Sequence, residues 1–495
     1  MMTPDFTTLV NEVASELIAQ KRIPRATYRM QFHKDFTFRD AEALVPYLDT
    51  LGISDLYASP ILKAVPGSTH GYDICDPRQL NPELGRVEDF LRLSAALQAR
   101  GMGLLIDIVP NHMGIGSDCN AWWLDVLEHG RESKYADFFD IEWNPAKHEL
   151  RDKVLLPILE DQYGNVLESG KLVVGYDRSK FYLTYGERRL PIAPETYGMI
   201  AEGHSKKALA QFNGTVGDPR SFDALDELIN AQHYRLAYWR VAGEEINYRR
   251  FFDINTMAAI HNELPEVFAA THGLVFDLLS SGYVTGLRID HPDGLWNPPA
   301  YFRKLHESAV LYRIPKRQRE LLQSSHPFPV DFRSQPAQKK AAEQAELEQE
   351  VSAWFDSYLS DEGKLPQAIY VVAEKILSET EPLPLDWAVD GTTGYDFLNL
   401  VNSLFVDNTA EADLSRIFAD FTRRPATISQ LEYASKKRTM ETSLAGELHL
   451  LARRLARLTE SNRHTRDFTF SGLHYALREV IACLPIYRTY ITGRD

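Results

Sequence analysis

The stretch Val284-Thr285-Gly286-Leu287-Arg288-Ile289-Asp290-His291 is a short apolar run that stops abruptly at charged side chains. Two other stretches have the same form, Ala368-Ile-Tyr-Val-Val-Ala-Glu374-Lys375 and Leu104-Leu-Ile-Asp107-Ile-Val-Pro-Asn111-His112. In a parallel α/β sheet, the carboxyl ends of the strands are where the chemistry lies. Three such strand ends with helical patterns between them predict a barrel enzyme that handles its substrate with carboxylates.

Strand and helix patterns alternate along the first part of the chain, which is the βαβ rhythm of a parallel sheet. Strands are predicted over residues 26–32, 56–61, 104–111, 284–290, 369–374 and 387–390. A helix is predicted from Ala41 to Leu51, with Gly52 at its C′ position. The rhythm is lost from about Met113 to Ile229, which predicts a subdomain inserted after the third strand.

Two later regions depart from this rhythm. A polar stretch with few apolar residues, from about Arg317 to Glu350, predicts an exposed helical or flexible insertion without a catalytic role. After about Phe405 the pattern is helical throughout. Leucines recur there at helical spacing, at positions 444, 448, 451, 455 and 458. We interpret this stripe as internal packing rather than a partner-binding zipper.

The composition is that of a globular protein, with 495 residues, 44% hydrophobic and 25% charged. A formal net charge of -15 argues against nucleic acid or an anionic membrane as partner. Neither a signal peptide nor an apolar stretch long enough to span a bilayer is visible, which predicts a cytoplasmic protein. The three cysteines suggest neither a zinc site nor a disulfide framework, and nothing indicates a cofactor.

The strand ends at Asp290 and Glu374 supply two carboxylic acids, which are enough for chemistry on a glycosidic bond. Arg288 lies two residues before Asp290, so both side chains point the same way from a strand. The adjacent guanidinium favours the charged form of Asp290, as a nucleophile requires. Partial burial after an apolar run would keep a proton on Glu374, as a general acid requires. A structural Arg–Asp ion pair beside an ordinary strand-end glutamate remains an alternative.

Several motifs, taken in their order along the chain, point to one class of enzyme. Asp107-Ile-Val-Pro-Asn111-His112, Gly286-Leu-Arg288-Ile-Asp290-His291 and Val372-Ala-Glu374 resemble, in this order, the first three sequence regions of the α-amylase superfamily of glycoside hydrolases. His70-Gly-Tyr72-Asp73 resembles the loop after the second strand of that superfamily. The resemblance implies a (β/α)8 TIM barrel of the α-amylase type.

Further stretches resemble the maltooligosyltrehalose synthases of glycoside hydrolase family 13. They are Ala26-Thr-Tyr-Arg-Met-Gln-Phe32, Trp122-Trp-Leu-Asp-Val-Leu-Glu128, Tyr135-Ala-Asp-Phe-Phe-Asp-Ile141, Tyr248-Arg-Arg-Phe-Phe-Asp-Ile-Asn255 and Gly391-Thr-Thr-Gly-Tyr-Asp-Phe397. Only the polar insertion near 317–365 falls outside the resemblance. Enzymes of this family turn the reducing-end α-1,4 link of a maltooligosaccharide into an α,α-1,1 link, which is a step of trehalose biosynthesis.

The resemblance implies a role for each site residue. Asp290 would be the nucleophile and Glu374 the acid/base, in a retaining double displacement. Five further residues would bind the substrate or support the site, namely Tyr72, Asp107, His112, Arg288 and His291. Tyr72 would stack on the sugar ring, the two histidines would hydrogen-bond its hydroxyls, and Asp107 would brace the shell. The segments 122–139 and 248–255 would close over the pocket and exclude water.

The resemblance also predicts the organisation of the chain. We expect barrel segments at 1–112 and 236–405, an inserted subdomain at 113–235, and a helical subdomain at 406–495. The family's third carboxylate lies in a motif resembling G-V-E-D-T, which this sequence lacks, so we expect an incomplete barrel and an N-terminal fragment. Because an open barrel leaves sheet edges unpaired, we expect low stability or a second polypeptide that supplies the remaining part.

Three hypotheses remain open at this point. The leading one is the maltooligosyltrehalose synthase reaction, with a maltooligosaccharide as substrate. The second is an α-amylase-type hydrolase acting on α-1,4-glucans, which the run from Tyr248 to Asn255 argues against. The third is a catalytically inactive maltodextrin-binding protein or assembly partner, which the missing carboxylate favours.

Overall fold

The computed structural model describes residues 6–200, 206–325, 337–378, 381–423 and 427–491. The chain divides into two compact units. The first comprises Met1–Asn111, Asn262–Val401 and Arg488–Asp495, and the second comprises His112–His261 and Asn402–Tyr487.

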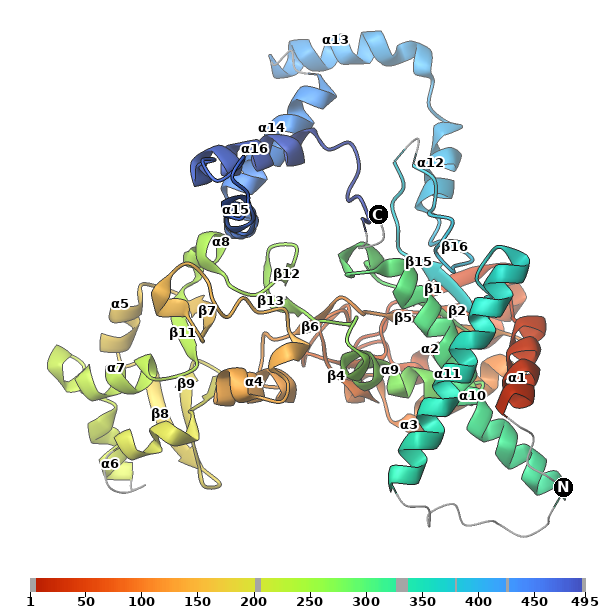
Figure 1. Cartoon of the computed structure of the whole chain (residues 1–495), viewed down its shortest axis with the longest axis horizontal. Coiled ribbons are helices and arrows are strands. Elements are labelled where there is room, and N and C mark those ends of the chain that lie inside the picture. Colours follow the sequence, from red (N-terminus) through yellow and green to blue (C-terminus); the bar gives the residue numbers. More distant parts are fainter. Residues whose placement is uncertain (1–5, 201–205, 326–336, 379–380, 424–426, 492–495) are drawn as a thin grey trace. The chain divides into compact units, whose positions relative to one another are not determined.

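The first unit is built on a sheet of order β1-β2-β5-β14-β15-β16, in which every neighbouring pair is parallel (Figure 1). Its strands are β1 (Thr27–Met30), β2 (Asp55–Ala58), β5 (Gly103–Ile108), β14 (Gly286–Ile289), β15 (Tyr370–Ala373) and β16 (Gly391–Thr392). The register sets Arg288 opposite Asp107 on one side and Val372 on the other. Within the described residues, β1 and β16 each have one neighbour in this sheet.

Helices alternate with these strands, as in a (β/α)8 fold. They are α2 (Phe38–Leu51), α3 (Val87–Gln98), α9 (Pro265–Ser280) and α10 (Pro298–Ser325). Buried apolar side chains from the strands, such as Leu56, Ile106 and Leu287, pack with Phe90 and Phe302 from the helices in one core. The predicted α/β class and (β/α)8 type of fold are therefore confirmed.

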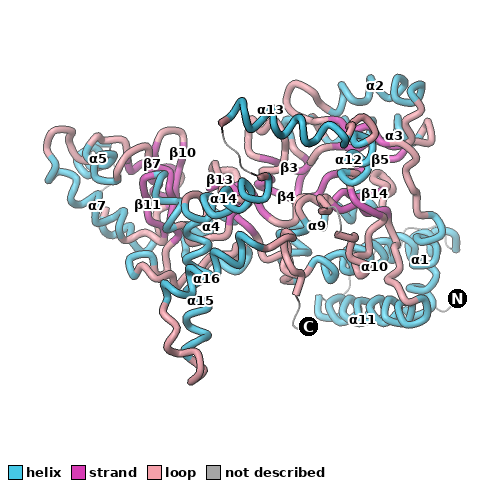
Figure 2. Tube along the Cα trace, turned by 90° about the horizontal axis from the view of Figure 1, so that it is seen from above, coloured by secondary structure: helices cyan, strands magenta, loops and turns pink. Residues whose placement is uncertain are grey.

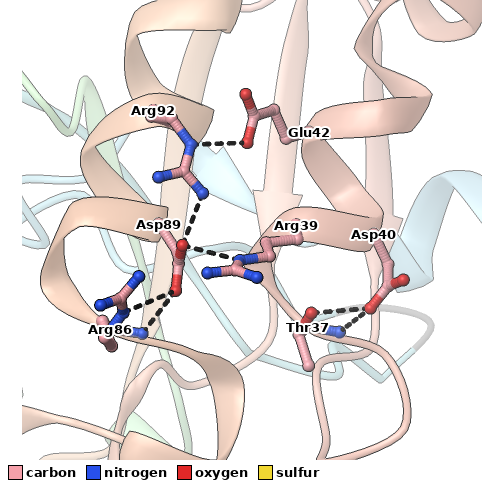
Figure 3. A network of polar contacts seen from close by, with 7 residues as sticks. All are labelled: Thr37, Arg39, Asp40, Glu42, Arg86, Asp89 and Arg92. Atoms are coloured by element: carbon pink, nitrogen blue, oxygen red, sulfur yellow. Dashed lines mark hydrogen bonds and ion pairs between the residues drawn. The ribbon is translucent and has the colours of Figure 1, made fainter.

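Polar contacts fix the beginning of α2 and join this helix to α3 (Figure 3). Thr37 and Asp40 bond across the first turn of α2, and Gly52 ends the helix with a left-handed φ of 85°, as predicted. Asp89 of α3 accepts a hydrogen bond from Arg39 of α2 at 2.8 Å. This bond holds the pKa of Asp89 well below its usual value, so the carboxylate stays charged between the two helices.

The predicted polar insertion is a packed helix where it is described. Helix α11 (Ala337–Glu362) lies beside α1 (Phe6–Gln20) and α10 (Figures 1 and 2). It buries Leu347, Val351 and Phe355 against apolar side chains of α1 and α10. The prediction of an exposed helical stretch is confirmed for residues 343–350, which are helical and mostly exposed apart from Leu347, whereas Val351 and Phe355 lie beyond the predicted stretch. Residues 326–336 lie outside the described residues.

The strand predicted over 387–390 is also misplaced. The sixth strand of the sheet is β16, which begins at Gly391. Trp387 instead packs in the core against Phe302 and Tyr490, with ring centroids 5.1 and 5.5 Å away. An aromatic residue before a strand gives the same apolar signal as a strand residue, which explains the error.

Among its described residues, the second unit contains three small sheets. They are the antiparallel order β10-β9-β8, the parallel pair β11-β7 and the antiparallel order β12-β13-β6. Their strands are β6 (His112–Gly114), β7 (Val154–Leu159), β8 (Leu172–Asp177), β9 (Lys180–Tyr185), β10 (Arg188–Pro191), β11 (Tyr234–Tyr238), β12 (Arg250–Phe251) and β13 (Ile254–Ala259). The pairing of β12 and β13 with β6 differs from our placement of residues 236–261 in the barrel. The domain boundaries themselves stay predictions.

The second unit also holds the helices that follow residue 405. They are α13 (Glu411–Thr422), α14 (Ile428–Glu441), α15 (Ala445–Glu460) and α16 (Phe470–Cys483). Their buried cluster consists of Met440, Leu448 and Ala482. Of the predicted leucine stripe, Leu448 is buried, whereas Leu451 and Leu458 are exposed. The stripe is therefore only partly used for packing. No helix in the described ranges is long and apolar enough to cross a bilayer.

Candidate active site

Arg288, the third residue of β14, lies among three carboxylates. Its Nη1 donates to Asp107 Oδ1 at 2.7 Å and to Asp290 Oδ1 at 2.6 Å. Its Nη2 lies 3.5 Å from Glu374 Oε2. Because β5, β14 and β15 are parallel neighbours, their carboxyl ends bring these side chains to one edge of the sheet. The structure thus brings the predicted catalytic pair to one guanidinium.

Both carboxylate oxygens of Asp107 accept hydrogen bonds. Its Oδ2 accepts hydrogen bonds from the hydroxyls of Tyr57 and Tyr72, both at 2.8 Å, while its Oδ1 faces Arg288. Arg29 donates in turn to the Tyr72 hydroxyl at 3.2 Å. The Asp107 side chain is fully buried. A carboxylate held on both oxygens is suited to orient its neighbours rather than to react.

Burial governs the protonation of the candidate nucleophile. It raises the pKa of Asp290 to about 7, and the negative charges of Asp107 and Glu374 add to the rise, while Arg288 opposes it. Burial likewise raises the pKa of Asp107. Arg288 lowers the pKa of Asp290, as expected, but the effect of burial is larger.

The loop after β14 is tightly constrained. His291 adopts a left-handed conformation with φ 43° and ψ 54°, which is uncommon outside glycine. Its backbone N–H donates to Glu374 Oε2 at 2.8 Å. A Cβ at Gly294 would lie 2.4 Å from Asn111 Oδ1, so only glycine fits there. The loop that follows the nucleophile thus also orients the candidate acid/base.

The predicted substrate-binding residues fall in both units. Tyr72 and His291 lie in the first unit, where the Tyr72 ring centroid is 5.9 Å from the Arg288 guanidinium carbon. Burial raises the pKa of the Tyr72 hydroxyl far above its usual value, so it remains a neutral donor. His112 is fully buried and begins the second unit, where its ring stacks on Phe251 with centroids 4.3 Å apart. The roles of all three stay predictions.

The segments expected to cover the pocket also lie in the second unit. Tyr248 is buried there, and its hydroxyl donates to the Asn255 carbonyl at 2.7 Å. This position makes Tyr248 part of the packing of that unit. Phe252 has a left-handed φ of 51° and a side chain that is 54% exposed. Phe252 therefore remains the better candidate for a residue that touches substrate.

Sequence reasoning gave no role to four residues around the site, Arg29, Tyr57, Lys375 and Tyr490. Arg29 and Tyr57 face each other in the register of β1 and β2, so their alternation with apolar neighbours was a usable signal. Lys375 and Tyr490 meet near the loop after β14. No local pattern links residues so far apart. Among the described residues, no group of three or more His, Cys, Asp or Glu side chains could hold a metal ion.

The sheet and its carboxylates define the class of protein. Residues 42–191 match the family model described as "Alpha amylase, catalytic domain". This part of the chain is therefore similar to the catalytic domain of α-amylases, as the ordered motifs predicted.

More specific similarity is to the maltooligosyltrehalose synthases. The chain is 36% identical over 444 residues to a Mycobacterium tuberculosis protein named "Putative maltooligosyl trehalose synthase", covering 87% of this chain and 45% of that protein. The match to the solved maltooligosyltrehalose synthase of Arthrobacter ramosus covers 95% of this chain and 49% of that enzyme. The identity is 32% and the TM-score is 0.70. A hypothetical maltooligosyl trehalose synthase of Sulfolobus tokodaii matches at 29% identity, covering 96% of this chain and 50% of its own, with a TM-score of 0.67. The predicted resemblance is confirmed, and the chain spans about half the length of these relatives.

Proposed function

We propose that this chain carries the catalytic pair of an intramolecular transglucosylase. The reaction converts the reducing-end α-1,4 bond of a maltooligosaccharide into an α,α-1,1 bond and gives maltooligosyl trehalose. The observation that carries the proposal is the convergence of Asp290 and Glu374 on Arg288 at neighbouring strand ends. Two carboxylic acids flanking one bond are what a retaining mechanism requires.

The proposed mechanism assigns one step to each acid. Glu374 protonates the bridging oxygen while Asp290 attacks the anomeric carbon and forms a glycosyl-enzyme ester. The released glucose turns within the pocket, and its anomeric hydroxyl attacks the ester while Glu374 accepts the proton. The His291 N–H bond keeps one Glu374 oxygen occupied, which leaves the other oxygen for proton transfer. Exclusion of water favours this attack over hydrolysis.

Asp107 does not replace the third carboxylate of the superfamily in this proposal. Both its oxygens are engaged and its side chain is fully buried, so it cannot approach a sugar without breaking its own bonds. We propose that a second polypeptide supplies that carboxylate. The large apolar side chains exposed after residue 395 support such a partner, because extended apolar surfaces mark interaction sites.

The test is to incubate the protein with maltopentaose and to follow reducing ends together with product mass. Falling reducing ends at unchanged mass are expected for isomerisation, and Asp290→Asn is the control that should abolish the change. Rising reducing ends would establish the α-amylase-type hydrolase instead.

A second arm adds the C-terminal half of the Arthrobacter ramosus enzyme as a separate chain. Activity that appears only with that half would support the second polypeptide. Activity of this chain alone would remove the need for a partner. Binding of maltopentaose without turnover in either arm would favour an inactive binding protein.

A further inference from the structure

A buried lysine lies directly after the candidate acid/base. The Lys375 side chain has no solvent exposure, and its Nζ lies 2.9 Å from Glu381 Oε1 and 3.4 Å from Asp293 Oδ2. Adjacent residues of an extended chain point to opposite sides. Glu374 turns toward Arg288, so Lys375 turns away from the reacting carboxylates. Its charge is therefore not part of the mechanism described above.

The partners of Lys375 come from the loops that follow two neighbouring strands. Asp293 lies three residues after Asp290, in the loop after β14, whereas Glu381 lies in the loop after β15. The ammonium thus joins the loop of the nucleophile to the loop of the acid/base. Since a buried charge is costly unless it is paired, the two loops are held at a fixed separation.

The segment from Arg488 to Tyr490 completes this network. Arg488 Nη1 donates to the carbonyls of Asp293 and Leu295 at 2.7 and 2.6 Å. The Tyr490 hydroxyl donates to Asp293 Oδ1, and its ring lies 5.5 Å from Lys375 Nζ. Two cations and two carboxylates are balanced, and both oxygens of Asp293 are engaged. A segment distant in sequence thereby secures the loop beside the candidate nucleophile.

We propose that Lys375 is a positioning residue, which with Arg488 and Tyr490 clamps the loops after β14 and β15 so that Glu374 and Asp290 keep a productive separation. The catalytic part of this inference rests on the proposed function, whereas the clamping part does not. Small misplacements of reacting groups carry large kinetic costs, since about 1 Å can cost about 10²-fold in rate. Loss of the clamp should therefore lower kcat and leave KM nearly unchanged.

Lys21, which directly follows α1, supplies a matched control near the amino end of β15. Its Nζ lies 2.5 Å from Asp390 Oδ1 and 2.8 Å from Gln367 Oε1, and its side chain is largely buried. Asp390 in turn bonds the backbone of Val371, near the amino end of β15. Lys21→Met thus removes a buried lysine ion pair at the opposite end of the strand from Glu374. It reports what general destabilisation alone does.

The first measurement is hydrogen exchange of peptides that cover 291–297 and 374–378, which needs no activity. Lys375→Met should speed exchange in both peptides at least fivefold, and Lys21→Met should leave both unchanged. Tyr490→Phe, which keeps the ring and should fold, is expected to speed exchange in the first peptide by about threefold. Unchanged exchange in Lys375→Met, or in Tyr490→Phe if the former does not fold, would overturn the clamp.

The second measurement is the kinetics of maltopentaose conversion, with the complementing half present if activity needs it. Lys375→Met should lower kcat about 10²-fold at similar KM, and Lys375→Arg should recover part of the loss. Faster exchange with unchanged kcat would overturn the positioning role while the proposed function stands. Faster exchange in Lys375→Met, together with no conversion by the wild-type chain, would overturn the proposed function and leave the clamp standing.

Discussion

The strand ends and the C-terminal helices differ in which side chains they bury and which they expose. Around Arg288 the polar groups are buried and bonded to each other. From residue 395 onward, large apolar side chains are exposed, and Phe405 and Phe421 expose 85% and 88% of their surfaces. The polar groups at the strand ends thus find their partners within the first unit, whereas the helices leave large apolar side chains without cover among the described residues.

The largest expected effect comes from the nucleophile at the strand ends. Asp290→Asn removes the attacking oxygen, and kcat for maltopentaose isomerisation should fall about 10⁴-fold or more. Asp177→Asn, at an exposed residue of β8 in the second unit, is the control and should keep wild-type activity. Residual activity within tenfold of wild type would mean that another group performs the attack.

The next effect concerns stability at the same edge. Arg288→Met leaves Asp107 and Asp290 buried without their guanidinium, which should lower the free energy of unfolding by about 3–5 kcal/mol. Urea denaturation measures this change. Arg416→Met on α13 breaks an exposed pair with Asp413 and should cost less than about 1 kcal/mol. Equal losses in the two variants would erase the contrast between the regions.

The C-terminal helices themselves contain both buried and exposed apolar residues, which can be compared directly. Leu448→Ala empties part of the buried cluster of α14–α16 and should cost about 2–5 kcal/mol. Phe421→Ser, on the exposed face of α13, should change stability by no more than about 0.5 kcal/mol. A large loss in Phe421→Ser, measured in the same urea titration, would show that α13 is covered in solution.

The pH dependence sharpens the description of the strand ends. Asp290 must be ionised to attack, and burial raises its pKa to about 7. Activity is therefore expected to fall as the pH drops below 7, by about tenfold per unit in kcat/KM. A pH–rate profile tests this. An acid limb centred below pH 5 would mean that Arg288 keeps the carboxylate ionised after all.

The smallest effect is expected in the second unit. If Phe252 helps to exclude water, Phe252→Ala should raise the ratio of hydrolysis to isomerisation by a few-fold without loss of stability. The exposed Phe397→Ala, outside the segments proposed to cover the pocket, is the control. Product analysis on maltopentaose gives the ratio, and an unchanged ratio would remove Phe252 from that role.

The sequence predicted the residues at the strand ends better than the residues around them. Asp107, Arg288, Asp290 and Glu374 could be predicted to meet, because an apolar run that ends in a charge is a local pattern and parallel neighbours share an edge. The raised pKa of Asp290 could not be predicted, because it depends first on the burial of this side chain in the folded chain. The contact between Lys375 and Tyr490 and the burial along α11 depend on packing between residues that are distant in the chain, which periodicity does not encode.

Arg288 sits in a strand whose neighbours on the other face of the pleat, Leu287 and Ile289, belong to the apolar core. If β14 paired with its register shifted by one residue, its two faces would be exchanged. The guanidinium would then lie in the apolar core, and two carboxylates would lose the cation that pairs with them. Such an arrangement is strongly disfavoured. The charge of Arg288 therefore also favours the correct register of β14 during folding.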